Sequence, residues 1–242
     1  RLVADRWDVD DLPREMSRLW PEDPSAAVAS LRALVGEGPA DLEGHSDVIG
    51  RVVDQVKVLE ADGWSFEAAD ASFELLLRRE ADEYTPLFEL ESFRVIVEKR
   101  ADGRVETEAT IKIWVDAERY VRTAEGNGPV NALDKALRDA IGERYPHLRD
   151  IQLVNFKVRI LDERKGTGAV TRVLLDASDG ADTWGTIGVS ENIIEASWEA
   201  LVDSLEAGML PGRREHERAR AAPESAGSAA DGSAGPRAAA PP

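Results

Sequence analysis

The residues best placed to bind a ligand lie where a glycine-rich turn meets the start of a predicted helix. Gly126-Asn127-Gly128-Pro129 leads into a helical pattern, and Pro129 suits the first helical position, where no N–H is needed. The start of a helix attracts anions through free N–H groups and the positive end of its dipole. The turn has neither the Lys-Ser/Thr pair of a P-loop nor a G-x-G-x-x-G spacing, which disfavours a nucleotide site. A single carboxylate, such as that of a free amino acid, fits better, although these glycines would equally suit a turn with no ligand.

Residue types that support metal or nucleophilic catalysis are scarce. The three histidines, His45, His147 and His216, lie in unrelated segments without the spacing of a metal site, and there is no cysteine. Disulfides, thiolate nucleophiles and cysteine metal sites are therefore excluded, and no Ser-His-Asp set can be assembled. We expect this chain to bind no metal and no cofactor.

Four glutamates alternate along predicted strands: Glu89, Glu91, Glu106 and Glu108. Such alternation is typical of the solvated face of an antiparallel sheet. We interpret these residues as a surface feature rather than as a general acid and base. No catalytic constellation emerges from the residues.

Charge and hydropathy limit the classes of binding partner that this chain is expected to have. The formal net charge of -17 disfavours nucleic acid and anionic membranes, which need clustered Lys and Arg. No apolar stretch approaches the roughly 20 residues of a membrane span. The charged residues 1–7 do not resemble a signal peptide. We therefore expect a cytoplasmic protein with no nucleic-acid or membrane partner, and the start at Arg1 rather than Met suggests a fragment.

Two helices are predicted ahead of the first strands. Apolar residues recur at helical spacing over residues 48–59, and a second helical pattern covers residues 66–79 with Ser65 as its N-cap. The short turn at Asp62-Gly63 predicts that the two helices pack as an antiparallel pair. They form a predicted helical linker subdomain over residues 46–85.

From residue 86 to 210 the order of three strands and a helix occurs twice. The predicted strands cover residues 93–97, 108–115 and 118–123 in the first unit and 151–161, 169–177 and 183–189 in the second. Asp102-Gly103 and Asp179-Gly180 make hairpin turns. The first helix runs from Pro129 to about Arg144, and the second, with Ser190 as its N-cap, to about Leu205.

The two predicted helices align with one another. The alignment matches Asn131–Asp134 with Asn192–Glu195, Leu137 with Trp198 and Ile141 with Val202. We therefore predict an α+β fold, a duplicated βββα unit with helices packed on antiparallel sheets about a pseudo-two-fold axis. Two amphipathic helices can also resemble each other by chance.

The two flanking segments differ in composition from this central part. Residues 1–45 carry scattered large apolar side chains among prolines and charges, and no fold is predicted for them. Residues 211–242 consist largely of Ala, Gly, Ser, Pro and Arg, which cannot bury enough apolar surface to order a chain. We predict a disordered tail there.

Three stretches resemble the citramalate synthase and 2-isopropylmalate synthase family. Trp64–Leu76 reads W-S-F-E-A-A-D-A-S-F-E-L-L, which is similar to the G-Y-x-F-E-A-A-x-A-S-F-E-L-L segment of citramalate synthases, and Phe88–Val95 continues it. Glu125–Leu133 resembles the G-N-G-P-V-x-A-L signature of the family's regulatory domain. Trp184–Trp198 is similar to its final strand and helix. The resemblance covers residues 46–210, whereas residues 1–45 do not resemble the family's preceding segment.

The resemblance implies a regulatory and dimerisation module without its catalytic barrel. Family enzymes condense acetyl-CoA with a 2-oxo acid, using a divalent metal and a base in that barrel. The regulatory domain dimerises and binds an end-product amino acid, isoleucine in citramalate synthases and leucine in 2-isopropylmalate synthases. The motifs are nearest to the citramalate type, which takes pyruvate and serves isoleucine biosynthesis. A leucine-biosynthesis module and a degenerate dimerisation remnant are the alternatives, and in each case the chain is expected to be inactive alone.

The resemblance also implies an effector site between the two units. Carried over position by position, it comprises Gly128, Pro129, Val130, Asn131, Leu153, Asn155, Phe156, Ile160, Ser190 and Asn192. The helix start would hold the carboxylate of isoleucine or leucine, and Leu153, Phe156 and Ile160 would enclose its side chain. The family often has Asp-Tyr where this chain has Asn155-Phe156, so we expect a partner for the ligand's ammonium group to be missing. The other implied partner is a second copy of the chain.

Overall fold

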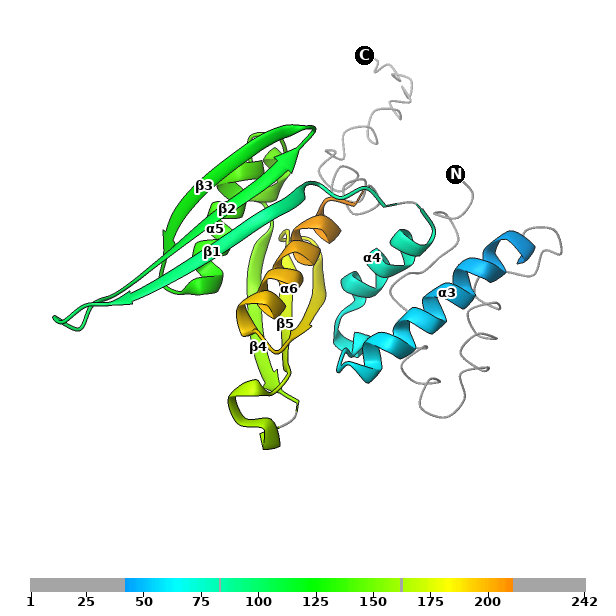
Figure 1. The fold of residues 1–242 in the computed structure, drawn as a ribbon. Coiled ribbons are helices and arrows are strands. Elements are labelled where there is room, and N and C mark those ends of the chain that lie inside the picture. The colour runs from blue at the N-terminus through cyan, green and yellow to red at the C-terminus, as the bar shows by residue number, and fades with distance from the viewer. Residues whose placement is uncertain (1–41, 83, 162, 211–242) are drawn as a thin grey trace, which may run out of the picture.

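The computed structural model describes residues 42–82, 84–161 and 163–210 (Figure 1). The predictions for residues 1–41 and 211–242 lie outside these ranges. Within them, α3 (Leu42–Ala61) and α4 (Asp70–Glu80) precede three strands and a helix, and the same order then repeats. The predicted α+β fold class is confirmed.

The helical linker differs from its prediction at the start of its second helix. A short 3-10 helix, η1 (Phe66–Ala68), comes first, and Ser65 makes no side-chain capping bond. Phe66 is buried in this turn with its ring 5.8 Å from that of Phe73, so the chain places one aromatic ring before α4 begins. The linker and the strand β6 (Thr183–Ser190) share a small core of Val52, Val53, Val56, Phe66, Ala69, Phe73, Leu76 and Ile187.

The first sheet is antiparallel, in the order β1-β2-β3. It consists of β1 (Glu89–Lys99), β2 (Val105–Val115) and β3 (Glu118–Gly126). Pairing continues to Lys99 and Val105 beside the turn at Gly103, so these strands are longer than predicted. The φ of Gly103 is +90°, a value that favours glycine. In Figure 1 the β1–β2 hairpin extends past the helix α5 (Pro129–Ile141).

The second sheet has the same topology, β4-β5-β6. Its strands are β4 (Gln152–Ile160), β5 (Thr171–Ser178) and β6 (Thr183–Ser190), with a 3-10 segment, η3 (Glu163–Gly168), between the first two. Each sheet carries an irregularity at one place in its first strand, between Leu90 and Ser92 in β1 and between Leu153 and Asn155 in β4. The shared irregularity confirms that the unit is duplicated.

The strand register relates the two units by a shift different from the predicted one. Thr107 pairs with Gly126 and Thr171 pairs with Ser190, so residue 190 corresponds to residue 126, 64 positions earlier. The helices follow the same shift, because α5 (Pro129–Ile141) and α6 (Ile193–Gly208) each begin three residues later. The predicted match of Leu137 with Trp198 is therefore wrong by three residues. Three residues are nearly one helical turn, so both alignments superpose apolar faces.

The cap of α6 is also corrected. The side chain of Asn192 accepts a hydrogen bond from the N–H of Ile194 at 2.9 Å. Ser190, the predicted cap, instead accepts from the N–H of Asn192 at 3.0 Å. Ser190 still belongs to β6, so it lies too early to cap the helix.

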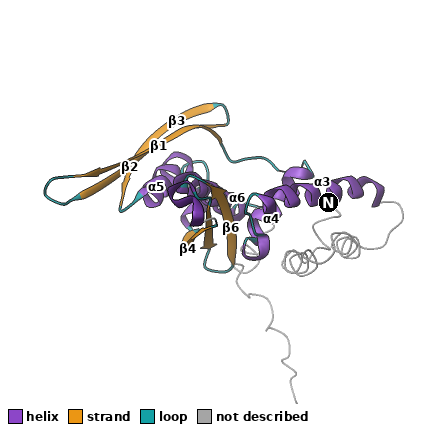
Figure 2. Ribbon diagram, turned by 60° about the horizontal axis from the view of Figure 1, so that its bottom comes forward, coloured by secondary structure: helices purple, strands orange, loops and turns teal. Residues whose placement is uncertain are grey.

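Each helix covers the inner face of one sheet. α5 packs on β2 and β3, and α6 packs on β5 and β6, as Figure 2 shows for the first sheet arching over α5. The buried positions of α5 and their counterparts in α6 are Ala132, Leu133, Ala136, Leu137, Ala140 and Ile141, and Ala196, Ser197, Ala200, Leu201, Ser204 and Leu205. Every one of these pairs is 64 residues apart, which confirms the register independently of the strands.

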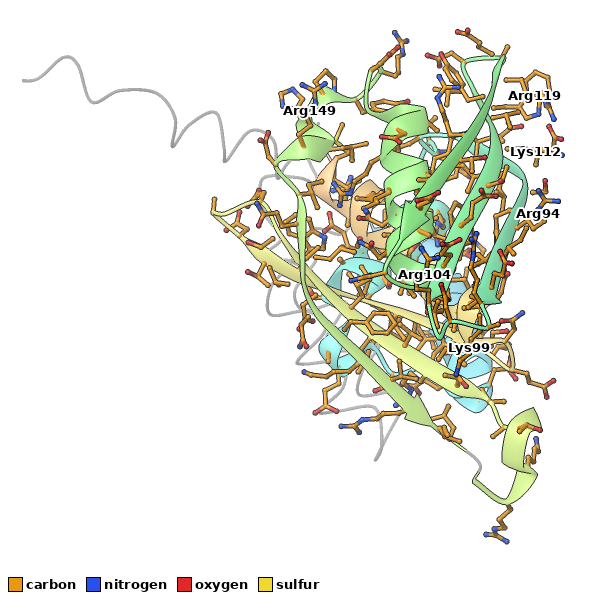
Figure 3. The ribbon with its side chains drawn as sticks, turned by 90° about the vertical axis from the view of Figure 1, so that its left-hand side faces the viewer. Arg94, Lys99, Arg104, Lys112, Arg119 and Arg149 are labelled. Carbon is orange, nitrogen blue, oxygen red and sulfur yellow. The ribbon has the colours of Figure 1, made fainter. Side chains whose placement is uncertain are left out.

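The outer face of the first sheet carries charged side chains beside the exposed Ile96, Trp114 and Val121. Arg94, Lys112 and Arg119 point away from α5 (Figure 3). Arg119 forms two bonds to the carboxylate of Glu91, at 2.6 and 2.8 Å. That pairing lowers the pKa of Glu91, chiefly through the hydrogen bond from Arg119. The interpretation of the alternating glutamates as a surface feature fits this arrangement.

A buried polar network fastens α4 to α6. Arg79 of α4 contacts Asp203 at 2.8 Å and Glu206 at 3.6 Å, although both carboxylates are almost fully buried. Ser72 donates to Asp203 at 2.7 Å, while the hydroxyl of Tyr84 donates to Glu206. Burial raises the pKa of Asp203 and raises that of Glu206 to about 7, against the opposing effect of Arg79.

The raised pKa of Glu206 predicts that the domain loses stability as pH rises. Between pH 4.5 and about 7 the folded state holds a proton that the unfolded state has released, so ionisation is unfavourable in the fold. We expect ionisation of Glu206 to lower the free energy of unfolding by about 3 kcal/mol across this window, and Glu206→Gln to remove that share of the pH dependence while the share due to Asp203 remains. Urea unfolding at pH 5 and pH 8 measures it. Exposed Glu98→Gln is the control, and equal slopes for wild type and Glu206→Gln would contradict the assignment.

The close approach of β6 to α6 predicts a second stability effect. A Cβ at Gly188 would lie 2.0 Å from the carbonyl oxygen of Ala196. Because this oxygen belongs to the backbone of α6, it cannot move aside as the end of a flexible side chain would. Gly188→Ala should therefore cost about 2 kcal/mol or more. Gly50→Ala, in α3 with nothing within 4 Å of the new methyl, should instead stabilise by about 0.5–1 kcal/mol. Thermal melts compare the two, and a similar melting temperature for both variants would be inconsistent with this packing.

Candidate functional site

A cavity of about 310 Å³ opens between the start of α5 and the edge strand β4. It is lined by Asn127, Gly128, Pro129, Val130, Asn131, Asp134, Leu153 and Phe156. The volume lies at the small end of ligand pockets, which suits a ligand of a few atoms rather than a nucleotide. The first unit supplies the helix and the second supplies the strand, so the cavity lies between the units.

The start of α5 supplies donors to this cavity. Its N-cap, Gly128, has no side chain, and Pro129 at the first position has no N–H. The N–H groups of Val130 and Asn131 lie in the first turn, where they have no acceptor within the helix. Asn131 accepts from the N–H of Asn127 at 3.2 Å, which holds the turn against the helix. The two residues that carry these free N–H groups therefore line the cavity.

Asp134 adds a carboxylate one turn further along α5. Its Oδ1 accepts from Nε of Arg138 at 2.7 Å, and Arg138 also donates to the carbonyl of Leu148 at 2.5 Å. The side chain of Asp134 is 16% exposed. A carboxylate accepts more than one hydrogen bond, so the bond to Arg138 does not saturate it. The cavity thus has an acceptor of negative charge beside its donors.

The opposite wall is apolar. Leu153 and Phe156 project from β4 on the side where Leu175 and Ala177 of β5 are buried, because these residues pair across the strands. The irregularity between Leu153 and Asn155 brings Leu153 and Phe156 onto one face although they are three residues apart. Phe156 remains 44% exposed.

Six of the ten predicted effector residues line the cavity, namely Gly128, Pro129, Val130, Asn131, Leu153 and Phe156. Ile160 shares the face of Phe156 but lies four residues along β4 and is 57% exposed. Ser190 and Asn192 lie beyond it, because Ile160 and Ser190 both pair with Thr171, at the end of the second sheet away from Leu153. These three residues are not among those that line the cavity.

Asn155 faces the other side of the sheet. Its side chain donates to Asp176 at 2.7 Å, across the strands and away from α6. The expected loss of an ammonium partner at this position therefore does not affect the cavity. Asp134, which was not among the predicted effector residues, lines the cavity from α5 instead. Its place one turn after Val130 and Asn131 was the available signal, since residues three and four apart share a helix face.

The described residues contain neither a metal-binding cluster nor a membrane-spanning helix. Within residues 42–82, 84–161 and 163–210 there is no group of three or more His, Asp or Glu side chains arranged to hold a metal ion. None of the helices in these ranges is long and apolar enough to cross a membrane.

The fold and the cavity together define a duplicated βββα domain with a small ligand-sized pocket between its units. Residues 67–209 match the LeuA allosteric (dimerisation) domain. The chain therefore belongs to the citramalate synthase and 2-isopropylmalate synthase family, and the matched part is its allosteric domain.

Curated relatives agree with this assignment. The chain is 53% identical to (R)-citramalate synthase of Streptomyces coelicolor over 187 residues. This alignment covers 76% of this chain and 35% of that protein. The corresponding protein of Aquifex aeolicus is 45% identical over 166 residues, 68% of this chain and 31% of the relative. A 2-isopropylmalate synthase of Pseudoalteromonas atlantica is 26% identical over 130 residues, 53% and 24% respectively. The chain spans about a third of the length of the first two relatives.

Proposed function

We propose that this domain senses a branched-chain amino acid and pairs with a second copy of itself, as the regulatory part of a citramalate synthase. The observation that carries the proposal is the cavity, which combines backbone donors, one carboxylate and an apolar wall. A free amino acid needs all three, because it bears a carboxylate, an ammonium group and a side chain on one carbon atom. The citramalate names of the relatives favour isoleucine as the ligand.

The proposed binding mode assigns each part of the ligand to a part of the cavity. The N–H groups of Val130 and Asn131 bind the carboxylate, aided by the helix dipole. Asp134 binds the ammonium group. Four residues of helix rise roughly 6 Å, which is enough for Val130 and Asp134 to hydrogen-bond opposite ends of one amino-acid head group placed between them. Leu153 and Phe156 contact the aliphatic side chain.

The parent protein's reaction is a further part of the proposal. Such a synthase condenses acetyl-CoA with pyruvate in the cytoplasm, using a divalent metal held in a catalytic barrel. The described residues take no part in that chemistry, and the 242-residue chain is expected to show no turnover alone. The alternative is a leucine-binding module of a 2-isopropylmalate synthase, and the similarity to the protein of Pseudoalteromonas atlantica supports it. A remnant that only pairs would bind neither amino acid.

The role of Asp134 is tested by calorimetry. We expect the full chain to bind isoleucine or leucine, and Asp134→Asn to weaken binding roughly tenfold to a hundredfold, the value of a charged hydrogen bond. Asp139→Asn, an exposed acid of the same helix, is the matched control and should bind as the wild type does. A folded wild type with no heat at millimolar isoleucine, leucine or valine would refute the sensing function.

An apolar row on β4 supports the pairing function. Phe156, Val158 and Ile160 point to the helix side of the second sheet, yet they remain 44%, 40% and 57% exposed. α6 packs on β5 and β6, and this edge strand lies beyond it. A contiguous exposed apolar row of this kind marks an interaction surface. We assign it to a second copy because the matched family is a dimerisation domain.

Pairing through β4 predicts that a charge at its centre separates the copies. Val158→Glu should shift the chain from dimer to monomer in sedimentation velocity at equal concentration, because a buried carboxylate without a partner is costly. Val58→Glu is the control, since Val58 is an equally apolar residue, 57% exposed on α3. A dimer unchanged by Val158→Glu would place the interface elsewhere, and a wild-type monomer would refute pairing.

A further inference from the structure

The duplication implies that the cavity has a counterpart elsewhere in the same chain. The shift of 64 residues matches Gly128 with Asn192, Val130 with Ile194 and Asp134 with Trp198. In the first strands, the shared irregularities match Leu153 with Leu90 and Phe156 with Phe93. The counterpart of the cavity therefore lies between the start of α6 and the edge strand β1.

That counterpart is filled by the chain itself. The ring of Trp198 lies 5.2 Å from that of Phe93 and 6.1 Å from that of Phe88, and Trp198 is only 5% exposed. Trp198 thus contacts Phe93 in the place where Asp134 and Phe156 line an open cavity. One position in the repeated helix decides whether the space holds an indole or remains empty.

The start of α6 is occupied as well. Asn192 accepts the hydrogen bond from Ile194 N–H at 2.9 Å, and Ile194 corresponds to Val130. Gly128, at the position of Asn192, has no side chain with which to do this for α5. The carboxamide oxygen of Asn192 therefore stands where the proposed carboxylate binds in the first unit, and the indole of Trp198 stands where the apolar part binds.

We propose that the chain contains two ligand-shaped sites related by pseudo-two-fold symmetry, and that Asn192 and Trp198 permanently occupy one of them as an internal ligand. The inference rests on the proposed amino-acid sensing function for the open site. It fixes the stoichiometry at one effector per chain, and it makes residues 134 and 198 the determinants of which site is open. It also accounts for the predicted effector residue Asn192, which is the counterpart of Gly128 and belongs to the closed site.

The closed site is tested without any amino acid. Trp198→Ala in the full chain should lower the melting temperature, and millimolar indole should restore several degrees of it, or restore folding if the variant is unfolded alone. Indole should not change the melting temperature of the wild type. Leu201→Ala is the control: Leu201 is fully buried but lies outside the counterpart of the cavity, so indole should not change the melting temperature of this variant either. Absence of any effect of indole on Trp198→Ala, folded or unfolded, would overturn the internal-ligand assignment.

The open site is tested by the reciprocal change. Asp134→Trp should stay folded, within a few degrees of the wild-type melting temperature, and should lose isoleucine and leucine binding in calorimetry. Wild type should bind one ligand per chain. Two ligands per wild-type chain, continued binding by Asp134→Trp, or its failure to fold would each overturn the inference. A wild type that binds nothing refutes the sensing function instead, and the indole experiment still decides whether Trp198 fills a ligand-shaped site.

Discussion

The architecture depends on a mismatch of widths between a helix and a three-stranded sheet. Three strands spaced about 4.8 Å apart occupy roughly 14 Å, whereas one helix with its side chains covers about 10 Å. α5 therefore covers β2 and β3, and α6 covers β5 and β6. The inner face of the first strand in each unit, β1 or β4, is covered much less by that unit's own helix than the other two strands are. The duplication places the helix of each unit beside the first strand of the other unit, α6 beside β1 and α5 beside β4.

The two halves solve it differently, and the difference produces the site. On β1, Trp198 packs on Phe93 and closes the gap. On β4, the corresponding residue is Asp134, too short and too polar to fill the space, so a cavity remains. The linker increases the asymmetry. α4 docks on α6, where Arg79 compensates the buried Asp203, whereas the counterpart of Asp203 in α5, Asp139, is exposed. The two helices therefore have equivalent backbone positions but different roles: α6 packs against the linker, and α5 lines the cavity.

Much of the fold was predictable because its signals are local. Strand alternation, the glycines at positions 103 and 180, and Pro129 at the start of α5 follow from backbone chemistry that each residue carries with it. The repeat was recognised, but its register was wrong by three residues, since helical periodicity hardly changes after such a shift. Strand pairing through Thr107 and Thr171 was needed to fix it.

The site was predictable only in part, for a related reason. Residues contributed by one turn, Gly128 to Asn131, and by one strand, Leu153 and Phe156, came from the family pattern and were brought together by the fold. Whether Asp134 and Asn155 line the cavity depends on the face of the helix or strand from which each side chain projects, and the sequence did not reveal this face. The irregularity in β4 turns Asn155 to the far side, and no periodicity in the sequence marks that irregularity.

Ligand binding and pairing are physically linked if both proceed as proposed, because they share one strand. Phe156 lines the cavity, and it also begins the apolar row that continues through Val158 and Ile160. A ligand that fixes the Phe156 ring changes the surface offered to the second copy, and the second copy in turn restricts the ring. Thermodynamic linkage then requires that an effector which strengthens pairing by some factor binds the dimer more tightly than the monomer by the same factor. Under the proposed function, the edge strand β4 is therefore the element that couples effector binding to pairing.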